Sequence, residues 1–267
     1  MSMSYQLLGS GDQKKIEQFG PYTIERPCSA ALWKLGKAFK ADASFSREEK
    51  KGWSFRKKLP DSWDIELKGI KLRLKATSFG HVGVFPEHAT QWPFLKKHAK
   101  KRVLSLFAYS GATTMYLAKQ GIEVCHVDAA KGMIDWAKEN AALNGLEDAP
   151  IRWIVDDVMK FLVREAKRGS IYDGVILDPP TFGRGAKGQV FKLEKDLHKL
   201  LGSIRNILSK KASFVLFTCH TPGITPITLE NLLLDSFGDK GTVESGELYI
   251  EGEDKLLPSG TYGRWFL

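Results

Sequence analysis

The sequence predicts a doubly wound α/β fold with a mostly parallel sheet, preceded by a small β-rich N-terminal extension. From Pro93 onward, short apolar runs alternate with longer segments of helical periodicity, as in repeated strand–helix units. The clearest strand is the apolar run Gly174–Leu177, which ends in Asp178 and two prolines. Ligands of open α/β sheets bind at the carboxyl ends of the strands. This buried strand, ending in a charge and rigid backbone, therefore indicates a binding crevice.

The remaining elements follow in chain order. Residues 1–60 show no clear alternation of apolar and polar residues, so we expect them to be irregular. Asp64–Leu67 and Ile70–Lys75 do alternate and predict two strands, with Gly80–Phe85 as a third candidate. We therefore expect residues 1–95 to form the extension and residues 96–267 the main domain. In the main domain we expect strands at 103–107, 124–128, 151–155, 174–177 and 214–218, helices at 113–119, 133–143, 158–167, 193–208 and 229–237, and a closing hairpin of 242–250 and 261–266.

The composition is that of a globular protein. Hydrophobic residues make up 43% and charged residues 27% of the chain, and no apolar run approaches the ~20 residues of a membrane span. The first ten residues lack the basic and apolar regions of a secretory signal. Cys28, Cys125 and Cys219 are scattered, which suits a reducing cytosol, and no close Cys/His cluster indicates a metal. We expect a cytoplasmic protein without a membrane span or metal; the oligomeric state stays open.

The net charge of +9 is concentrated in the N-terminal part. Residues 1–102 contain 21 Lys and Arg against 10 Asp and Glu, whereas the remainder contains 19 against 21. Basic residues recur on both sides of Trp53, in 46–51 and in Arg56-Lys57-Lys58. Such an asymmetry indicates a polyanionic partner, and nucleic acid is the simplest one. A solvated basic surface kept for solubility is the alternative.

The first strand–turn–helix unit has a glycine turn, made by Phe107, Ala108, Tyr109, Ser110 and Gly111. A dinucleotide site would need the pattern G-x-G-x-x-G, so that the pyrophosphate can approach bare backbone. Here Ala112-Thr113-Thr114 follows the single glycine. The turn therefore argues against NAD and for a ligand without a pyrophosphate.

Acidic residues end the next two strands. Asp128 can accept both hydroxyl hydrogens of a ribose, or it can cap the helix that contains Met133. One strand later, Asp157 can accept from an adenine amino group while Val158 packs on the ring. Alternatively, Asp156 or Asp157 only caps the following helix.

Together these stretches resemble class I S-adenosylmethionine (SAM) methyltransferases, in particular the 23S ribosomal RNA large-subunit group of 5-methylcytosine and 7-methylguanine enzymes. The resemblance runs from Val103 to Thr218. The matching words are Leu-Phe107-Ala-Tyr-Ser-Gly111, Val-Asp128-Ala-Ala-Lys-Gly-Met-Ile-Asp-Trp-Ala-Lys-Glu-Asn-Ala-Ala-Leu-Asn-Gly145, Asp156-Asp-Val-Met-Lys-Phe161 and Leu-Asp178-Pro-Pro-Thr-Phe-Gly-Arg-Gly185.

The resemblance implies a seven-stranded sheet, SAM as cofactor with S-adenosylhomocysteine as product, and ribosomal RNA as partner. Those enzymes often carry an N-terminal RNA-binding domain, which residues 1–95 are too short and differently patterned to match. The residues expected at the cofactor are Phe107, Ala108, Tyr109, Ser110, Gly111, Asp128, Ala129, Asp156, Asp157, Val158, Asp178 and Pro179.

The methyl acceptor is expected beside Asp178 and Phe182, the residues to which we assign catalytic roles together with Cys219. The stiff Asp178-Pro179-Pro180 backbone can grip a base edge, and Phe182 can stack a flipped base or simply be a core aromatic. Arg184 and Lys187, in the loop that follows, can contact phosphate or be solvated charges.

Cys219, at the end of the run Phe214–Thr218, allows two interpretations. Methylation at carbon-5 of cytosine needs a thiolate that first adds at carbon-6, and a cysteine beside a helix N-terminus can have a depressed pKa for that role. The pair Thr218-Cys219 resembles the Thr-Cys of RNA cytosine-5 methyltransferases, although His220 replaces the usual serine. Otherwise Cys219 is a small buried hydrophobe, and the acceptor is an already nucleophilic nitrogen. A protein or small-molecule acceptor, or a protein that only binds SAM, are the remaining alternatives.

Overall fold

A computed structural model describes residues 4–48, 52–184, 190–211 and 214–267 of the chain. The chain forms two compact units. Unit 1 comprises Met1–Thr90 and Tyr249–Ser259, and unit 2 comprises Gln91–Leu248 and Gly260–Leu267. Within the described ranges, no helix combines the length and the apolar character that crossing a membrane requires.

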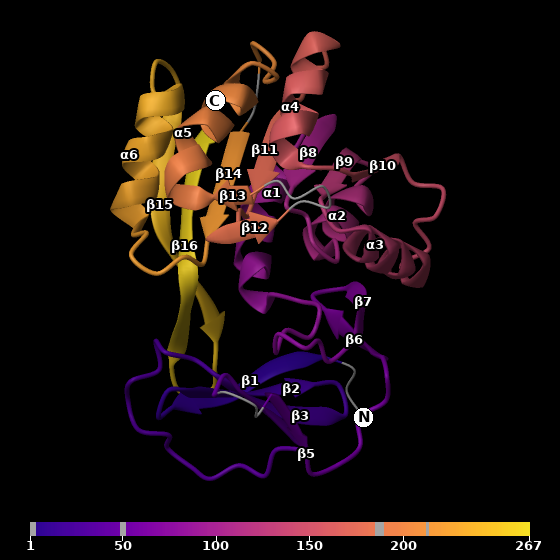
Figure 1. The fold of residues 1–267 in the computed structure, drawn as a ribbon, viewed down its shortest axis with the longest axis vertical. Helices are drawn as coiled ribbons and strands as arrows, with labels where there is room; N and C mark the ends of the chain where they lie inside the picture. Colours follow the sequence, from indigo (N-terminus) through magenta and orange to yellow (C-terminus); the bar gives the residue numbers. More distant parts are fainter. Residues whose placement is uncertain (1–3, 49–51, 185–189, 212–213) are drawn as a thin grey trace. The chain divides into compact units, whose positions relative to one another are not determined.

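Unit 2 is built on a seven-stranded sheet with the order β10-β9-β8-β11-β14-β16-β15 (Figure 1). Five of its strands are parallel: β8 (Arg102–Leu106), β9 (Glu123–Asp128), β10 (Ile151–Val155), β11 (Gly174–Leu177) and β14 (Phe214–Cys219). The hairpin of β15 (Thr242–Glu251) and β16 (Leu256–Phe266) closes one edge, with β16 antiparallel to β14. Every residue of β11 and β14 is buried, as expected for central parallel strands. The mostly parallel, doubly wound sheet is confirmed.

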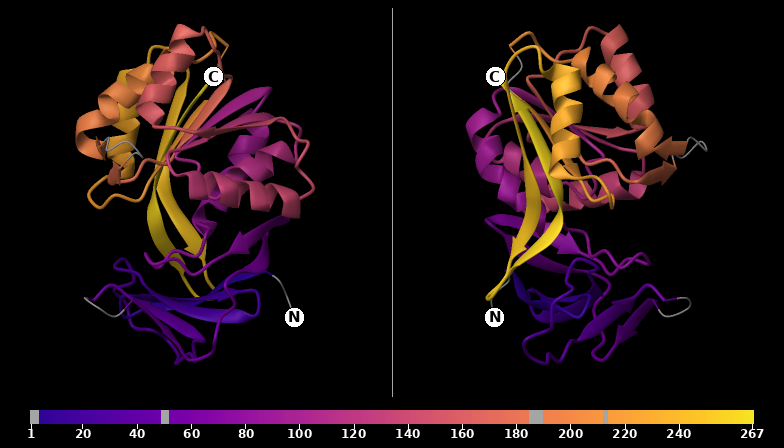
Figure 2. Two further views of the ribbon diagram at one scale, coloured as in Figure 1. Left: turned by 45° about the vertical axis from the view of Figure 1, so that its right-hand side comes forward. Right: turned by 90° about the vertical axis from the view of Figure 1, so that its left-hand side faces the viewer.

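Helices cover both faces of this sheet (Figure 2). One layer contains α1 (Trp92–His98), α2 (Ala112–Ala118) and α3 (Lys131–Leu143); the other contains α4 (Val158–Lys167), α5 (Leu193–Arg205) and α6 (Pro226–Phe237). The starts of α4 and α6 follow from their caps, because Asp157 accepts from the Lys160 N–H and Thr225 accepts from the Thr228 N–H. A short hairpin of β12 (Phe182–Arg184) and β13 (Val190–Lys192) joins β11 to α5, and the 3-10 turn η1 spans Pro86–Gln91.

Unit 1 contains a five-stranded sheet, and the expectation that residues 1–60 are irregular is wrong. Its strands, in sheet order, are β1 (Tyr5–Gly11), β2 (Lys14–Phe19), β3 (Tyr22–Pro27), β4 (Ala43–Ser46) and β5 (Gly52–Phe55). A separate pair, β6 (Trp63–Leu67) and β7 (Ile70–Leu74), matches the alternating stretches of the sequence. The candidate strand at 80–85 is also wrong, since that segment forms no strand.

A buried ion pair explains why the strands of unit 1 are hard to recognise. Arg26 donates to both carboxylate oxygens of Glu17, at 2.7 and 2.9 Å, and the Tyr5 hydroxyl donates to the same carboxylate at 3.0 Å. Burial opposes ionisation, but Arg26, Lys15 and the hydrogen bonds together hold the pKa of Glu17 below its usual value. Two charges at inward positions break the apolar alternation that signals a strand.

Candidate cofactor and acceptor site

The predicted site residues gather at one edge of the unit 2 sheet. Strands β8 and β11 are neighbours although β9 and β10 lie between them in the chain, so the winding direction reverses at this point. In doubly wound sheets the crevice at such a reversal, outside the carboxyl ends of the strands, is where ligands bind. The loops that follow β8 and β11 carry Phe107–Gly111 and Asp178–Phe182.

The loop after β8 has unusual backbone geometry. Phe107 and Tyr109 have φ of 56° and 52°, in the left-handed region, and Gly111 follows with φ of 84°. A non-glycine residue in that region costs on the order of 1–3 kcal/mol and persists only where the surroundings enforce it. Such strain is common at ligand-binding loops, and here it falls on the stretch that the sequence assigns to the cofactor.

Two hydrogen bonds hold this loop, and a third links the helix and the strand next to it. The Ser110 carbonyl accepts from Asn140 Nδ2 at 2.8 Å, and the Tyr109 N–H donates to Asp128 Oδ2 at 3.0 Å. Below the loop, buried His126 is 2.8 Å from Thr114 Oγ1 through its Nδ1. Neither Asn140 nor His126 was predicted from the sequence to support the site. The available signal was a polar residue on the buried face of a helix or strand, which in a folded protein needs a partner.

Asp128 connects the first two loops. Its Oδ2 holds Tyr109, and its Oδ1 accepts from the Ala130 N–H at 2.9 Å. The alternative that Asp128 caps α3 is wrong, because the cap position is Ala130 and has no side-chain hydrogen bond. Burial raises the pKa of Asp128, while the backbone N–H groups oppose this shift. The partly exposed carboxylate has further lone pairs for hydroxyl donors.

At the end of β10 the two aspartates differ in their surroundings. Asp157 caps α4 through the Lys160 N–H at 3.0 Å, so the capping alternative holds for this residue. Asp156 accepts from the Asp157 N–H and forms an ion pair with Arg164. Val158 is buried in the core of unit 2. A cap occupies one oxygen of Asp157, which leaves its second oxygen for an amino group.

Asp178 is positioned by the neighbouring strand. Thr218 Oγ1 donates to Asp178 Oδ1 at 2.9 Å, and His220 Nε2 lies 3.7 Å from the same oxygen. Pro179 is buried, which fixes the backbone behind the carboxylate. Phe182 is 47% exposed, so the alternative that it is a core aromatic is wrong. Lys187 and the side chain of Arg184 lie outside the part of the chain that the structure describes.

Cys219 is 1% exposed and packs in the hydrophobic core. Successive residues of a strand point to opposite faces, so Cys219 faces away from the side on which Thr218 meets Asp178. Burial raises the pKa of the Cys219 thiol, the Asp178 carboxylate raises it further, and hydrogen bonds from Thr221 oppose the shift. The expectation of a depressed pKa is therefore wrong.

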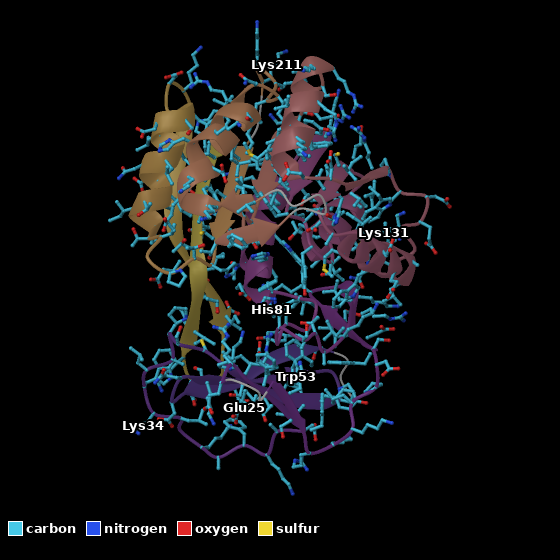
Figure 3. All side chains as sticks on the ribbon, viewed as in Figure 1. Glu25, Lys34, Trp53, His81, Lys131 and Lys211 are labelled. Carbon is cyan, nitrogen blue, oxygen red and sulfur yellow. The ribbon has the colours of Figure 1, made fainter. Side chains whose placement is uncertain are left out.

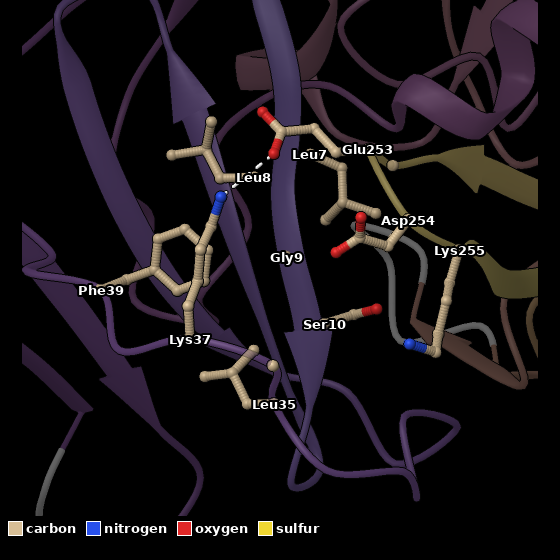
Figure 4. Close-up of a pocket in the computed structure, with 12 residues that line it drawn as sticks. Leu7, Leu8, Gly9, Ser10, Leu35, Lys37, Phe39, Glu253, Asp254 and Lys255 are labelled. Carbon is tan, nitrogen blue, oxygen red and sulfur yellow. Dashed lines mark hydrogen bonds and ion pairs between the residues drawn. The ribbon is translucent and has the colours of Figure 1, made fainter.

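The donors and acceptors at this edge fit SAM. The methionine part of SAM offers an ammonium group and a carboxylate, and its adenosine part offers ribose hydroxyls and an amino group. The sheet edge presents carboxylates at the ends of β9, β10 and β11, beside the loop Phe107–Gly111 with its left-handed backbone. A separate hollow in unit 1, lined by β1, residues 35–39 and the turn 252–255, contains none of these residues and is crossed by an ion pair of Lys37 with Glu253 (Figure 4).

Comparisons with known proteins agree with this geometry. The family model described as S-adenosylmethionine-dependent methyltransferase matches residues 22–237. The crystal structure of a SAM-dependent methyltransferase from Agrobacterium tumefaciens is 39% identical, with a TM-score of 0.93 over 98% of this chain and 90% of that one. A putative SAM-dependent methyltransferase from Streptococcus mutans is 18% identical with a TM-score of 0.79, over 99% of this chain and 75% of that one, and shows the shared fold.

Among curated proteins, the ribosomal RNA large subunit methyltransferase K/L of Shewanella baltica is 33% identical over 177 residues. The match covers 64% of this chain and 24% of that protein, so the chain spans about a quarter of the length of this relative. The family match extends over most of the chain and includes the strand-end residues described above. This chain is a SAM-dependent methyltransferase and belongs to the S-adenosylmethionine-dependent methyltransferase family.

Proposed function

We propose that the protein methylates a base of ribosomal RNA, with Asp178 at the acceptor. The observation that carries this proposal is the combination of two side chains in one loop. Asp178, just after β11, is held by Thr218, and the exposed ring of Phe182 follows four residues later. A carboxylate and an aromatic face are the two groups that recognise an unstacked base, by hydrogen bonding its edge and stacking on its plane. The name of the curated relatives, which are ribosomal RNA methyltransferases, supports the same substrate class.

When bound, SAM supplies a methyl group activated by the adjacent sulfonium. The residues that would hold it are Phe107–Gly111, Asp128, Ala129, Asp156, Asp157, Val158, Asp178 and Pro179. Asp128 would accept from ribose hydroxyls with the lone pairs left after its bonds to Tyr109 and Ala130. Asp157 would accept from the adenine amino group. The enzyme's main task is to align the acceptor with the methyl group in a site that excludes water.

At the acceptor, Asp178 accepts a hydrogen bond from an N–H of the base and so fixes the base edge. Thr218 keeps the carboxylate in place, and Phe182 limits the tilt of the base by stacking. The position of Cys219 supports an acceptor nitrogen that is nucleophilic without covalent activation, because the thiol is buried and its pKa is raised. Carbon-5 of cytosine, with Cys219 as nucleophile, is the second candidate. It is favoured by the position of Cys219 in the chain between Thr218 and His220, which both lie beside Asp178.

The test is methyl transfer from labelled SAM to total RNA from cells that lack this protein, with digested nucleosides identified by mass spectrometry. Wild type, Cys219→Ala and Asp178→Asn are compared, with a cell-protein fraction as a second acceptor. We expect a methylated base that Cys219→Ala still forms and Asp178→Asn forms at least about a hundred times more slowly. A 5-methylcytidine signal that disappears in Cys219→Ala would identify the cysteine as the nucleophile. Labelling of the protein fraction alone would overturn the RNA proposal.

We further propose that the basic extension, residues 1–95, binds RNA phosphates. Charge reversal at Arg56, Lys57 and Lys58 is the direct test, and the three positions are not equivalent. Arg56 forms an ion pair with Asp42 at 2.8 Å and donates to the Ala41 carbonyl, so its reversal also disturbs the fold. Lys58 is exposed, and Lys58→Glu should weaken RNA binding and lower its salt dependence. If Lys58→Glu, Lys57→Glu and added salt all leave the RNA affinity unchanged, the proposed binding of RNA phosphates by this extension is refuted.

A further inference from the structure

We infer that unit 1 carries a stacking platform for single-stranded RNA, formed by the side chains of Phe45, Trp53, Phe55 and Phe79. We call these four residues the aromatic platform. The inference rests on the proposed function in one respect, since that proposal names RNA as the ligand. The contacts that form the platform lie entirely within unit 1.

Strands β4 and β5 place three of the rings in a row. Phe45 and Trp53 are direct cross-strand partners, with ring centroids 5.2 Å apart in an edge-to-face arrangement. Trp53 and Phe55 are two residues apart on one strand, so they share a face, and their rings are stacked with centroids 6.0 Å apart. Figure 3 labels Trp53 in unit 1. The row ends at Phe55, whose side chain is 51% exposed.

The fourth ring, that of Phe79, belongs to a hydrogen-bonded turn. Phe79 is 78% exposed and lies in the turn Thr77–Gly80, closed by a hydrogen bond from the Gly80 N–H to the Thr77 carbonyl at 3.0 Å. Trp53 Nε1 donates to the Thr77 carbonyl at 2.6 Å, which ties the turn to the row of rings.

Gly80 explains how close the turn comes to the platform. Its φ is +81°, and a Cβ placed there would lie 2.4 Å from the Phe45 ring. On the other side of the turn, Arg26 Nη1 donates to the Gly80 carbonyl at 3.3 Å. The backbone of the turn that carries Phe79 is therefore tied on both sides and does not have to be ordered when a ligand binds.

The exposure of Phe55 and Phe79, beside the half-buried rings of Phe45 and Trp53, needs a reason. Single exposed apolar side chains are normal on protein surfaces, but a row of three aromatic rings in contact, tied through Trp53 to the turn that carries a fourth ring, indicates a binding surface. Phe55 is followed directly by Arg56, Lys57 and Lys58, and exposed Arg47 follows β4. Rings that stack on bases, beside cations that contact phosphates, are the recurrent design of single-strand binding sites.

Charge favours RNA over a protein partner. Residues 1–102 contain 21 basic against 10 acidic residues, so the platform lies in a strongly basic segment. Only an unpaired strand can place its bases on the rings, because bases in an RNA duplex are already stacked and paired. The platform should therefore bind single strands with little sequence preference and should discriminate against duplexes.

The experiment measures the affinity of the full chain, without SAM, for dye-labelled single-stranded RNA of about ten nucleotides by fluorescence anisotropy. The variants are Phe55→Leu and Phe79→Leu, which keep an apolar side chain but remove the ring. Two variants are controls. Phe55→Trp keeps an aromatic stacking surface, and Leu32→Ala removes an apolar side chain that is 77% exposed but not aromatic. Thermal melting of each variant checks the fold, and an RNA duplex of equal length is the ligand control.

Each Leu substitution should raise the Kd for the single strand by roughly 5- to 150-fold, the range of one lost base–aromatic stack. Phe55→Trp and Leu32→Ala should bind within about twofold of wild type, and the duplex should show no such dependence on the rings. Folded Leu variants that bind the single strand like wild type would overturn the platform, even if the wild type methylates RNA. Ring-dependent binding by a protein that labels no RNA would keep the platform and refute the proposed substrate.

Discussion

Substituting Gly111 by alanine should destabilise the protein more than the same change at another glycine with a similar backbone. Gly111 has φ of +84°, and a Cβ at this position would lie 3.2 Å from Ala137 Cβ, 3.2 Å from His126 Cε1 and 3.3 Å from Met115 Cε. These separations are shorter than an ordinary van der Waals contact between carbon atoms. Gly121 has φ of +76° and no atom within 4 Å of such a Cβ, so it is the matched control.

The magnitude follows from three contributions. The left-handed backbone costs an alanine about 1–2 kcal/mol, and a methyl group forced into a packed core costs about 1–3 kcal/mol. Alanine also restricts the unfolded chain more than glycine does, which stabilises the folded protein by about 0.4–1 kcal/mol. Gly111→Ala should therefore lose about 1–5 kcal/mol of unfolding free energy, whereas Gly121→Ala, without the contact contribution, should lose less than about 2 kcal/mol. The two losses should differ by the contact contribution of about 1–3 kcal/mol.

Two measurements test this. Denaturant unfolding of both variants gives the difference in unfolding free energy, and calorimetric titration gives the affinity for SAM. Because Gly111 lies in the strained loop with Phe107 and Tyr109, its displacement should also weaken SAM binding by about tenfold or more. Gly121 precedes β9, at the opposite edge of the sheet, so Gly121→Ala should bind SAM like wild type.

Unfolding free energies of the two alanine variants that agree within about 0.5 kcal/mol would contradict the predicted packing cost at Gly111. That result would mean that the three neighbouring side chains move aside without cost. A Gly111→Ala protein that is destabilised as expected but binds SAM normally would keep the packing argument and remove this loop from the cofactor site.

Thr218→Val removes the hydroxyl that donates to Asp178, and methyl transfer should fall about tenfold, the equivalent of one hydrogen bond to a charged acceptor of about 1.5 kcal/mol, measured as kcat/KM. Burial lowers the pKa of His126 to about 3, so the unfolded chain binds a proton below about pH 6.5 that the folded chain excludes. Stability should fall with decreasing pH between these values, and His126→Gln should remove up to about 1.4 kcal/mol per pH unit of that slope in denaturant unfolding. Arg26→Met leaves the Glu17 carboxylate buried without its partner and should cost about 3–5 kcal/mol of unfolding free energy.

Each of these has a control in the chain. Thr218→Ser keeps a hydroxyl and should retain most of the activity; equal losses in the Ser and Val variants would contradict the role of the hydrogen bond. For His126, an unchanged pH slope in the Gln variant would show that the imidazole is not excluded from protonation. For Arg26, the exposed pair of Lys14 with Glu25 is the comparison, since Lys14→Met should change stability by less than about 1 kcal/mol. Similar losses at Arg26 and Lys14 would contradict the effect of burial.

The sequence by itself determined the architecture of unit 2. Strands β10 and β11 and helix α4 begin and end where the sequence predicts, because apolar runs and helical periodicity are local signals. Asp128, Asp157 and Asp178 were predicted as site residues for the same reason, since a charge directly after an apolar run marks a strand end. Parallel strands bring such ends to one edge, so the composition of the candidate site could be predicted without knowing any distance.

Only the tertiary structure decided the features that depend on contacts distant in sequence. Unit 1 includes Tyr249–Ser259, where Ile250 and Leu257 share a core with Leu7, and no local pattern predicts that association. Its sheet was missed because Glu17 and Arg26 neutralise each other inside it, which a linear pattern of apolar residues cannot show. Cys219 is the sharpest case: the sequence places it at a strand end beside the site, but the side on which its thiol packs depends on the surrounding core. That core buries the thiol and raises its pKa, because an ionised sulfur there would lose the solvation that water provides.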